Sequence, residues 1–184
     1  MEIAFRRTCG PCRSRRILPN RVDHREQVAA LGHPIEIIGG REEARLVYLG
    51  VAHTTPAADE DRLVVDIGGG STEIIQGRGF EPRWAASRFM GSVKFTRQFF
   101  DAGPLQREQF RAAQTAASQQ IQDLREQFRD VTFDRVLGAS GTALAVSALL
   151  RKLDFTDGRI DYAAMKRLRR LMIEDLRGPW YDAE

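Results

Sequence analysis

The chain has 184 residues and a formal net charge of +3, a length that allows one domain with its own core, or one domain and part of another. Residues 1–26 hold seven arginines against three acidic residues, a charge of +4, so the other 158 residues sum to −1 and lack the charge of a nucleic-acid binder. No apolar run approaches the ~20 residues of a membrane-spanning helix, and no apolar stretch of a secretory signal follows the basic N-terminus, so we expect a cytoplasmic protein without a membrane partner.

Residues 1–26 form an atypical, arginine-rich leader. They follow neither a helical nor a strand period, and glycine and proline interrupt them. A divergent or disordered leader has this composition, and so does a misread start of the coding sequence. Both interpretations stay open.

A Cys9-Gly-Pro-Cys12 segment inside this leader matches the thioredoxin active-site motif. Thioredoxin chemistry needs a strand before the motif and a helix that starts at its first cysteine, because that helix lowers the pKa of the thiol. Only eight residues precede Cys9, and an arginine-rich stretch with a proline follows Cys12. His24 and His33 do not complete a standard zinc spacing either. The residues favour neither redox nor metal function here.

The segment between the leader and residue 60 reads as a strand at 34–38 and a helix at 42–51. Apolar residues recur with helical spacing at Ala44, Val47, Tyr48 and Val51. This spacing predicts a helix with one buried face.

Residues 62–75, Arg-Leu-Val-Val-Asp-Ile-Gly-Gly-Gly-Ser-Thr-Glu-Ile-Ile, carry the most informative pattern. An apolar strand runs into Asp66 and three glycines, and a second apolar strand follows at once. Because Gly68, Gly69 and Gly70 have no Cβ, the backbone can turn sharply there and bring its N–H groups close to an anion.

Two hydroxyls follow the glycines, and Ser71 and Thr72 would add side-chain donors. Asp66 can hold a cation that offsets phosphate charge. No Gly-Lys-Ser/Thr is present and no helix opens after the glycines, so this is neither a Walker loop nor a dinucleotide fingerprint. The pattern predicts a hairpin whose tip binds phosphate together with a metal ion, the alternative being a plain hairpin with a flexible tip.

The rest of the chain reads as one more strand of this sheet, a second strand with a glycine turn, and several helices. These are a strand at about 83–88, a short helix at 91–100, one long amphipathic helix at 105–128, a strand and turn at 131–142, a helix at 143–153 and a last helix capped by Asp161. A helix that starts after the second glycine turn would point its free N–H groups at whatever lies beside that turn. The Lys166-Arg167 and Arg169-Arg170 pairs of the last helix are expected to form a solvated face.

Four blocks occur in a recognisable order: Ile38-Gly-Gly-Arg-Glu-Glu-Ala-Arg-Leu-Val-Tyr-Leu-Gly-Val, the segment from Val65 to Glu73, Arg88-Phe-Met-Gly-Ser-Val-Lys-Phe-Thr and Leu137-Gly-Ala-Ser-Gly-Thr. Over about residues 26–177 the chain resembles the exopolyphosphatase and guanosine pentaphosphate phosphatase family. The resemblance implies an α/β fold, a ribonuclease H-like (actin-like ATPase) domain with a mixed sheet flanked by helices. It also implies hydrolysis that releases terminal phosphate from polyphosphate or guanosine pentaphosphate.

The resemblance also assigns roles to residues. Glu43 matches the position taken to orient or activate the attacking water, and Asp66 would position Mg²⁺. The phosphate-binding residues would be Gly68, Gly69, Gly70, Ser71 and Thr72. Gly138, Ser140 and Gly141 would border the cleft.

The organisation implied by the family is a remnant of a first domain and hinge at 27–45, followed by the second domain at 46–184. The family's first phosphate loop, of the type Asp-x-Gly-Ser-Asn-Ser, is not found in this sequence. Its closing C-terminal elements would follow residue 184. We therefore expect a fold that is incomplete at both ends, from a family whose usual state is a homodimer.

Three functional interpretations stay open. The first is an exopolyphosphatase-type hydrolase, for which polyphosphate and guanosine pentaphosphate are both candidate substrates. The second is a non-catalytic phosphate-binding module, because the loss of one wall of the cleft removes groups that would stabilise the transition state. The third is a nonfunctional product of a damaged gene.

Overall fold

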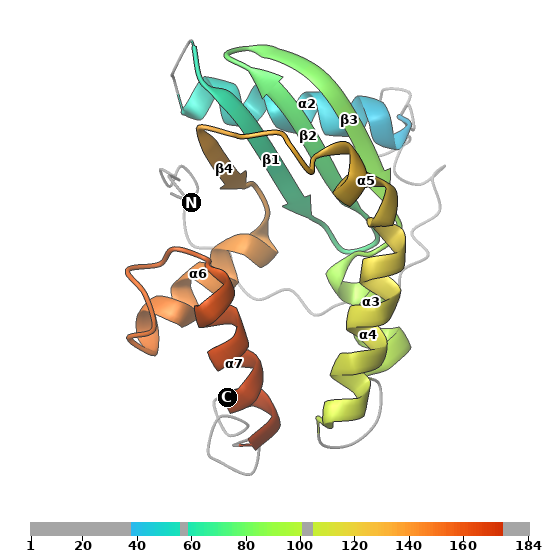
Figure 1. Cartoon of the computed structure of the whole chain (residues 1–184), viewed down its shortest axis with the longest axis vertical. Coiled ribbons are helices and arrows are strands. Elements are labelled where there is room, and N and C mark those ends of the chain that lie inside the picture. The colour runs from blue at the N-terminus through green and yellow to red at the C-terminus, as the bar shows by residue number, and fades with distance from the viewer. Residues whose placement is uncertain (1–37, 56–58, 101–104, 175–184) are drawn as a thin grey trace, which may run out of the picture.

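The computed structural model describes residues 38–55, 59–100 and 105–174. The leader, both cysteines, His24, His33 and most of the strand expected at 34–38 lie outside the described residues. In the described ranges, a four-stranded sheet has helices against both of its faces (Figure 1). The expected α/β architecture is confirmed. None of the described helices is long and apolar enough to cross a membrane.

The sheet is mixed and has the strand order β3-β2-β1-β4. Its strands are β1 (Asp61–Ile67), β2 (Thr72–Arg78), β3 (Glu81–Arg88) and β4 (Arg135–Gly138). Strands β1, β2 and β3 form an antiparallel meander, whereas β4 lies parallel to β1. Because β1 and β4 are parallel, the glycine turns that follow them meet at the same edge of the sheet.

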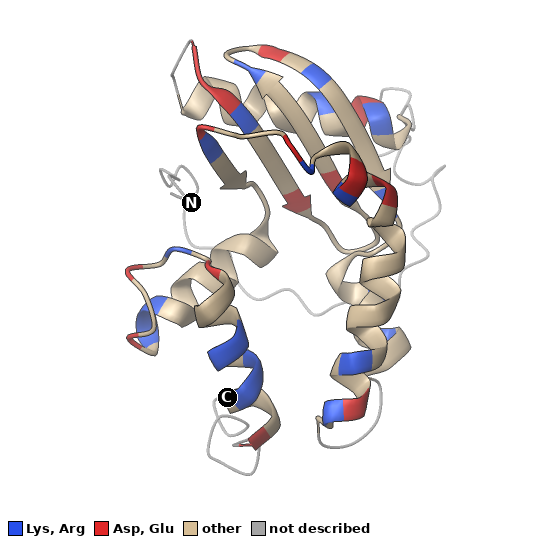
Figure 2. Cartoon of the chain, in the orientation of Figure 1, with Lys and Arg blue, Asp and Glu red and all other residues tan. Residues whose placement is uncertain are grey.

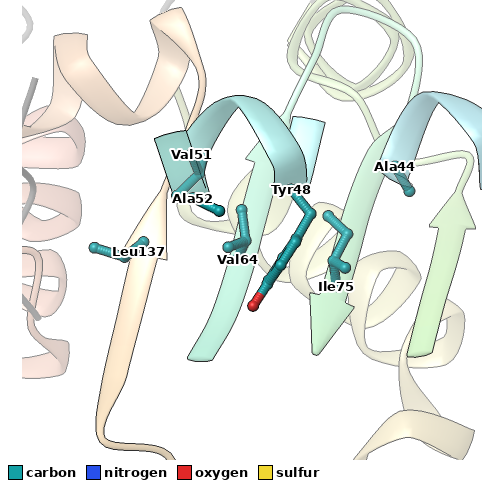
Figure 3. Close-up of a cluster of buried hydrophobic side chains, with 7 residues drawn as sticks. All are labelled: Ala44, Tyr48, Val51, Ala52, Val64, Ile75 and Leu137. Carbon is teal, nitrogen blue, oxygen red and sulfur yellow. The ribbon is translucent and has the colours of Figure 1, made fainter. Parts of the chain in front are cut away.

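Helix α2 (Gly40–Thr54) covers one face of the sheet, and its apolar stripe makes the main core. Figure 3 shows this cluster, which consists of Ala44, Tyr48, Val51, Ala52, Val64, Ile75 and Leu137. The Tyr48 ring lies over β2 at Gly77, where a Cβ would overlap the ring, and its hydroxyl donates to the Gly79 carbonyl at 3.1 Å. Each large apolar side chain buried here stabilises the fold by about 1.5–3 kcal/mol.

Helices α3 (Ser92–Phe99), α4 (Arg107–Gln120) and α5 (Gln122–Gln127) lie toward the other face. The prediction of one long helix at 105–128 is wrong, because the chain leaves the helix at Ile121, with φ −116° and ψ 13°. The Arg88 guanidinium donates a hydrogen bond to the Gln120 carbonyl at 2.8 Å and also forms an ion pair with Asp123. In an unbroken helix that carbonyl would accept from the residue four positions later. A contact from β3 therefore replaces one helical hydrogen bond.

Helices α6 (Gly141–Lys152) and α7 (Tyr162–Glu174) pack on each other around a second apolar cluster. Its buried members are Leu150, Ala164 and Leu168. The predicted cap of α7 is confirmed, since the Asp161 carboxylate accepts from the Ala164 N–H at 2.8 Å.

Candidate phosphate site and carboxylate cluster

Strands β1 and β2 are joined by a four-residue tip, Gly68 to Ser71. Ile67 and Thr72 form the last pair of the ladder, and the Gly68 N–H closes the tip by donating to the Ser71 carbonyl at 3.0 Å. The predicted hairpin is confirmed.

The tip docks onto the first turn of α3 through its carbonyl groups. The N–H groups of Ser92 and Lys94 donate to the carbonyls of Gly68 and Gly69, at 2.8 and 3.0 Å. The Ser92 hydroxyl donates to the Gly68 carbonyl as well, at 3.1 Å. The tip therefore satisfies N–H groups that the start of a helix otherwise leaves free.

Gly91, immediately before α3, makes this close approach possible. Its N–H donates to the Gly70 carbonyl at 3.1 Å. A Cβ at Gly91 would overlap the backbone of Gly69 and Gly70. Any larger residue at this position would push the tip away from α3.

The N–H groups of Gly69, Gly70 and Ser71 point away from α3. In a planar trans peptide the N–H lies opposite the carbonyl, and the carbonyls of these peptides, on Gly68, Gly69 and Gly70, all accept from the start of α3. In the described parts of the chain, these three N–H groups donate to no acceptor. Successive backbone N–H groups that face the same way form a site for an anion.

The three glycines of the tip keep this anion site accessible, and none of them adopts a positive φ angle. Among the described glycines, positive φ angles occur at Gly79 and Gly158 and at none of the three in the tip. Gly70 is exposed, and a Cβ there would meet nothing within 4 Å. The chain turns sharply at the tip as expected, and the missing side chains leave the N–H groups open to a ligand.

The two hydroxyl residues after the glycines have different surroundings. Thr72 is buried, and its hydroxyl donates to the Met90 carbonyl at 2.8 Å. The expectation that Thr72 offers a hydroxyl donor to phosphate is corrected, because its hydrogen is already in use. Ser71 lines a groove of about 570 Å³ that Glu43 also lines.

Two carboxylates face each other just below the tip. Asp66 of β1 and Glu73 of β2 are cross-strand partners. Glu73 is 2% exposed and accepts a hydrogen bond from the Ser87 hydroxyl at 2.8 Å. Burial raises the pKa of Asp66 above its ordinary value, and the Glu73 carboxylate raises it further.

Glu43 approaches the same pair from α2. The period of two along β1 and β2 puts Asp66 and Glu73 on the face that α2 covers, together with Val64 and Ile75. Partial desolvation raises the pKa of the Glu43 carboxyl, and the charges of Glu73 and then Asp66 raise it further. The structure therefore brings two predicted site residues, Glu43 and Asp66, into one acidic cluster with Glu73.

The turn between β4 and α6 lies at the same edge of the sheet. The Ala139 N–H donates to the Val65 carbonyl at 3.0 Å, which ties this turn to the end of β1. Thr142 in the first turn of α6 reaches Ser92 of α3, with 3.4 Å between the two hydroxyl oxygens. The starts of α3 and α6 are thus neighbours.

The predicted cleft residues in this turn have unequal surroundings. Ser140 is buried and caps α6, since its hydroxyl oxygen accepts from the Ala143 N–H at 3.1 Å. Gly141 is exposed and has open space where a Cβ would lie, whereas Gly138 ends β4. Ser140 therefore shapes the turn, and Gly141 is the more accessible of the three.

A magnesium site at Asp66 fits the donor set. In residues 38–55, 59–100 and 105–174, no three acidic, histidine or cysteine side chains gather as ligands of one ion. Magnesium is usually held by one or two carboxylates, with water and phosphate oxygens as the other ligands. The Asp66–Glu73 pair beside an anion site offers that number of carboxylates.

The sequence profile of the Ppx/GppA phosphatase family matches residues 14–174. The chain belongs to this family. The match includes α2, the whole sheet and helices α3 to α7. Both the glycine tip and the carboxylate cluster thus lie inside the family domain.

Two relatives from the family have named activities. A guanosine-5'-triphosphate,3'-diphosphate pyrophosphatase of Vibrio vulnificus is 43% identical over 76% of this chain and 28% of its own length. A Haemophilus influenzae protein named "Putative exopolyphosphatase" is 42% identical over 74% of this chain and 42% of its own. The chain therefore spans less than half the length of these relatives.

Solved structures of the family share this fold. A Ppx/GppA enzyme of Aquifex aeolicus is 25% identical, with a TM-score of 0.63 over 80% of this chain and 50% of its own. An exopolyphosphatase of Cytophaga hutchinsonii is 22% identical, with a TM-score of 0.65 over 79% of this chain and 49% of its own. The ribonuclease H-like (actin-like ATPase) fold class is confirmed.

Two residues of the site, Glu73 and Gly91, have no role in the prediction from sequence. An acid between the apolar residues of a strand is a signal of a buried functional carboxylate, and Glu73 precedes Ile74 and Ile75. Gly91 carries no such local signal, because its partner is the tip more than 20 residues earlier.

Proposed function

We propose that the chain acts on phosphoanhydride bonds and releases the terminal phosphate of inorganic polyphosphate with Mg²⁺. The single observation that carries this proposal is the set of free N–H groups at Gly69, Gly70 and Ser71, directly above the Asp66–Glu73 pair. Such a site accommodates a phosphate and a cation side by side. The names of the family and of both relatives support the reaction class.

The tip would hold the terminal phosphate by its N–H groups, which donate to the charge that develops on phosphate oxygens in phosphoryl transfer. Asp66 and Glu73 would hold Mg²⁺, which when bound neutralises phosphate charge. Glu43 would accept a proton or a hydrogen bond from the attacking water. A pKa raised by desolvation, and further by its acidic neighbours, suits the Glu43 carboxyl to that task, since a base works best when its pKa lies closer to the working pH.

Guanosine pentaphosphate is the second candidate substrate, because the Vibrio vulnificus relative is named as its pyrophosphatase. A non-catalytic phosphate-binding module is the third candidate, since the chain spans only part of its relatives' length. A cytoplasmic location, a homodimer and the absence of a nucleic-acid partner remain predictions from the sequence.

Phosphate release from polyphosphate with Mg²⁺ tests the proposal. Glu43→Gln should abolish release, while Glu42→Gln should retain it. Glu42 is a matched control, because it is the neighbouring acid on α2 and pairs at the surface with Arg45 at 3.1 Å. Tripolyphosphate binding without release would establish the non-catalytic module, and equal release by both variants would refute the role of Glu43.

A further inference from the structure

Asp66, Glu73 and Ser87 form one row across three strands. Asp66 of β1 is the cross-strand partner of Glu73 of β2, and Glu73 is in turn the partner of Ser87 of β3. Directly paired residues of adjacent strands lie on the same face of a sheet. In Figure 2, acidic positions occur on β1 and β2 where the two strands approach the tip. The row therefore adds to the two carboxylates a hydroxyl that the proposed function does not use.

The Ser87 hydroxyl occupies one of the two carboxylate oxygens of Glu73. It donates to Glu73 Oε1 at 2.8 Å. The other oxygen, Oε2, accepts no hydrogen bond in the described residues. Because Glu73 is 2% exposed, its surroundings and this bond hold the side chain in place. Glu73 thus keeps one oxygen, Oε2, for a ligand.

The donor to Glu73 is neutral, although a cation stands next to it in the sequence. Arg88 follows Ser87 on β3, but successive side chains of a strand point to opposite faces, and Arg88 pairs with Asp123. In the described parts of the chain, Glu73 forms no ion pair. A hydroxyl orients a carboxylate without neutralising it, whereas an arginine would cancel its charge. The charge of Glu73 therefore stays available to a bound cation.

The start of α2 packs directly against Ser87. A Cβ at Gly40, the first residue of this helix, would lie 2.7 Å from the Ser87 Cβ and 2.8 Å from its Oγ. Only a residue without a side chain allows this approach. Glu43, in the first turn of the same helix, lines one groove together with Ser87 and Ser71. The contact at Gly40 thus restrains the Ser87 hydroxyl beside the proposed site.

We propose that Ser87 is a positioning residue, which holds Glu73 with one oxygen free and thereby makes the cation site select Mg²⁺ over Ca²⁺. This inference rests on the proposed function, in which Asp66 and Glu73 hold the cation. Mg²⁺ demands strict octahedral geometry and uses one or two carboxylates, whereas Ca²⁺ takes more ligands and often both oxygens of one carboxylate. With Oε1 of Glu73 held by Ser87, the second oxygen that Ca²⁺ would use is occupied.

Amide NMR titrations of the full chain with MgCl₂ and, separately, with CaCl₂ test this inference. The shifts of the Asp66 and Glu73 amides give the two affinities. Ser87→Ala should weaken Mg²⁺ binding by about tenfold, as expected when a hydrogen-bond partner of a metal-binding carboxylate is lost. The Ca²⁺ affinity should stay within about twofold, because the freed Oε1 becomes a ligand for it. The ratio is the decisive readout, since a purely structural role for Ser87 would lower both affinities alike.

Two further variants accompany Ser87→Ala. Ser147→Ala is the matched control, because Ser147 is a buried serine of α6, outside the row, whose hydroxyl donates to the Gly158 carbonyl at 2.7 Å. It should lose a comparable hydrogen bond and keep the ratio of the two affinities. Gly40→Ala keeps the Ser87 hydroxyl but crowds it, so it should shift the ratio toward Ca²⁺.

The contrary results are distinct from one another. Equal loss of Mg²⁺ and Ca²⁺ affinity in Ser87→Ala would overturn the selection, and unchanged affinities would remove Ser87 from the site. A ratio that changes equally in Ser147→Ala would make general destabilisation the cause. If Mg²⁺ shifts neither the Asp66 nor the Glu73 amide of the unmodified chain, the cation site of the proposed function itself is refuted, together with the inference that rests on it.

Discussion

Asp66 and Glu73 are direct partners across β1 and β2, so two carboxylates stand opposite each other immediately below the glycine tip. Like charges directly opposite in an antiparallel pair destabilise a sheet. Glu73 is also almost fully buried. A bound cation would offset the repulsion between these two carboxylates. The proposed function places Mg²⁺ there, between the carboxylates and the phosphate.

Replacing Asp66 by asparagine should therefore stabilise the fold. The raised pKa of Asp66 means that the folded state favours the protonated carboxyl, so the free energy of unfolding falls as the pH rises from 3.8 through the raised value. At neutral pH the variant should unfold with a free energy about 0.2–1 kcal/mol higher. Urea denaturation at two pH values measures this. Below pH 3.8 the two proteins should be equally stable, and a less stable variant at neutral pH would contradict the account.

The pH dependence of phosphate release should report Glu43. Its carboxyl must lose a proton to act as a base, so kcat/KM should rise with pH through a pKa above the ordinary value of 4.5. Asp66→Asn removes one of the charges that raise the pKa of Glu43. The residual kcat/KM of that variant should therefore begin to increase at a lower pH than in the unmodified chain. Initial rates across the acidic range measure both profiles. An unmoved profile in Asp66→Asn would mean that another group titrates.

Gly91→Ala should displace the tip from α3. The new methyl group would overlap the Gly69 backbone, which costs about 1–3 kcal/mol of stability and weakens tripolyphosphate binding. Gly50→Ala is the control, since a Cβ there meets nothing within 4 Å in helix α2, and alanine should stabilise this helix by about 0.5–1 kcal/mol. Thermal unfolding measures the stability of both variants, and a titration measures their affinity for tripolyphosphate. Unchanged binding by a folded Gly91→Ala protein would show that docking on α3 does not shape the phosphate site.

Local sequence patterns predict much of this fold and part of the site. The spacing from Ala44 to Val51 predicts α2, and the run through Gly68 predicts the hairpin, because each pattern reflects neighbours in the chain. The break at Ile121 escapes prediction, since it depends on Arg88, a residue of another element.

The first measurement should be an amide NMR titration of the full chain with tripolyphosphate and Mg²⁺, because it observes the proposed phosphate donors directly. The account predicts large shifts of the Gly69, Gly70 and Ser71 amide protons, and a smaller shift of Gly68, whose N–H already donates to Ser71. Binding of tripolyphosphate that leaves the Gly69, Gly70 and Ser71 resonances in place would contradict the central claim that the glycine tip holds the terminal phosphate.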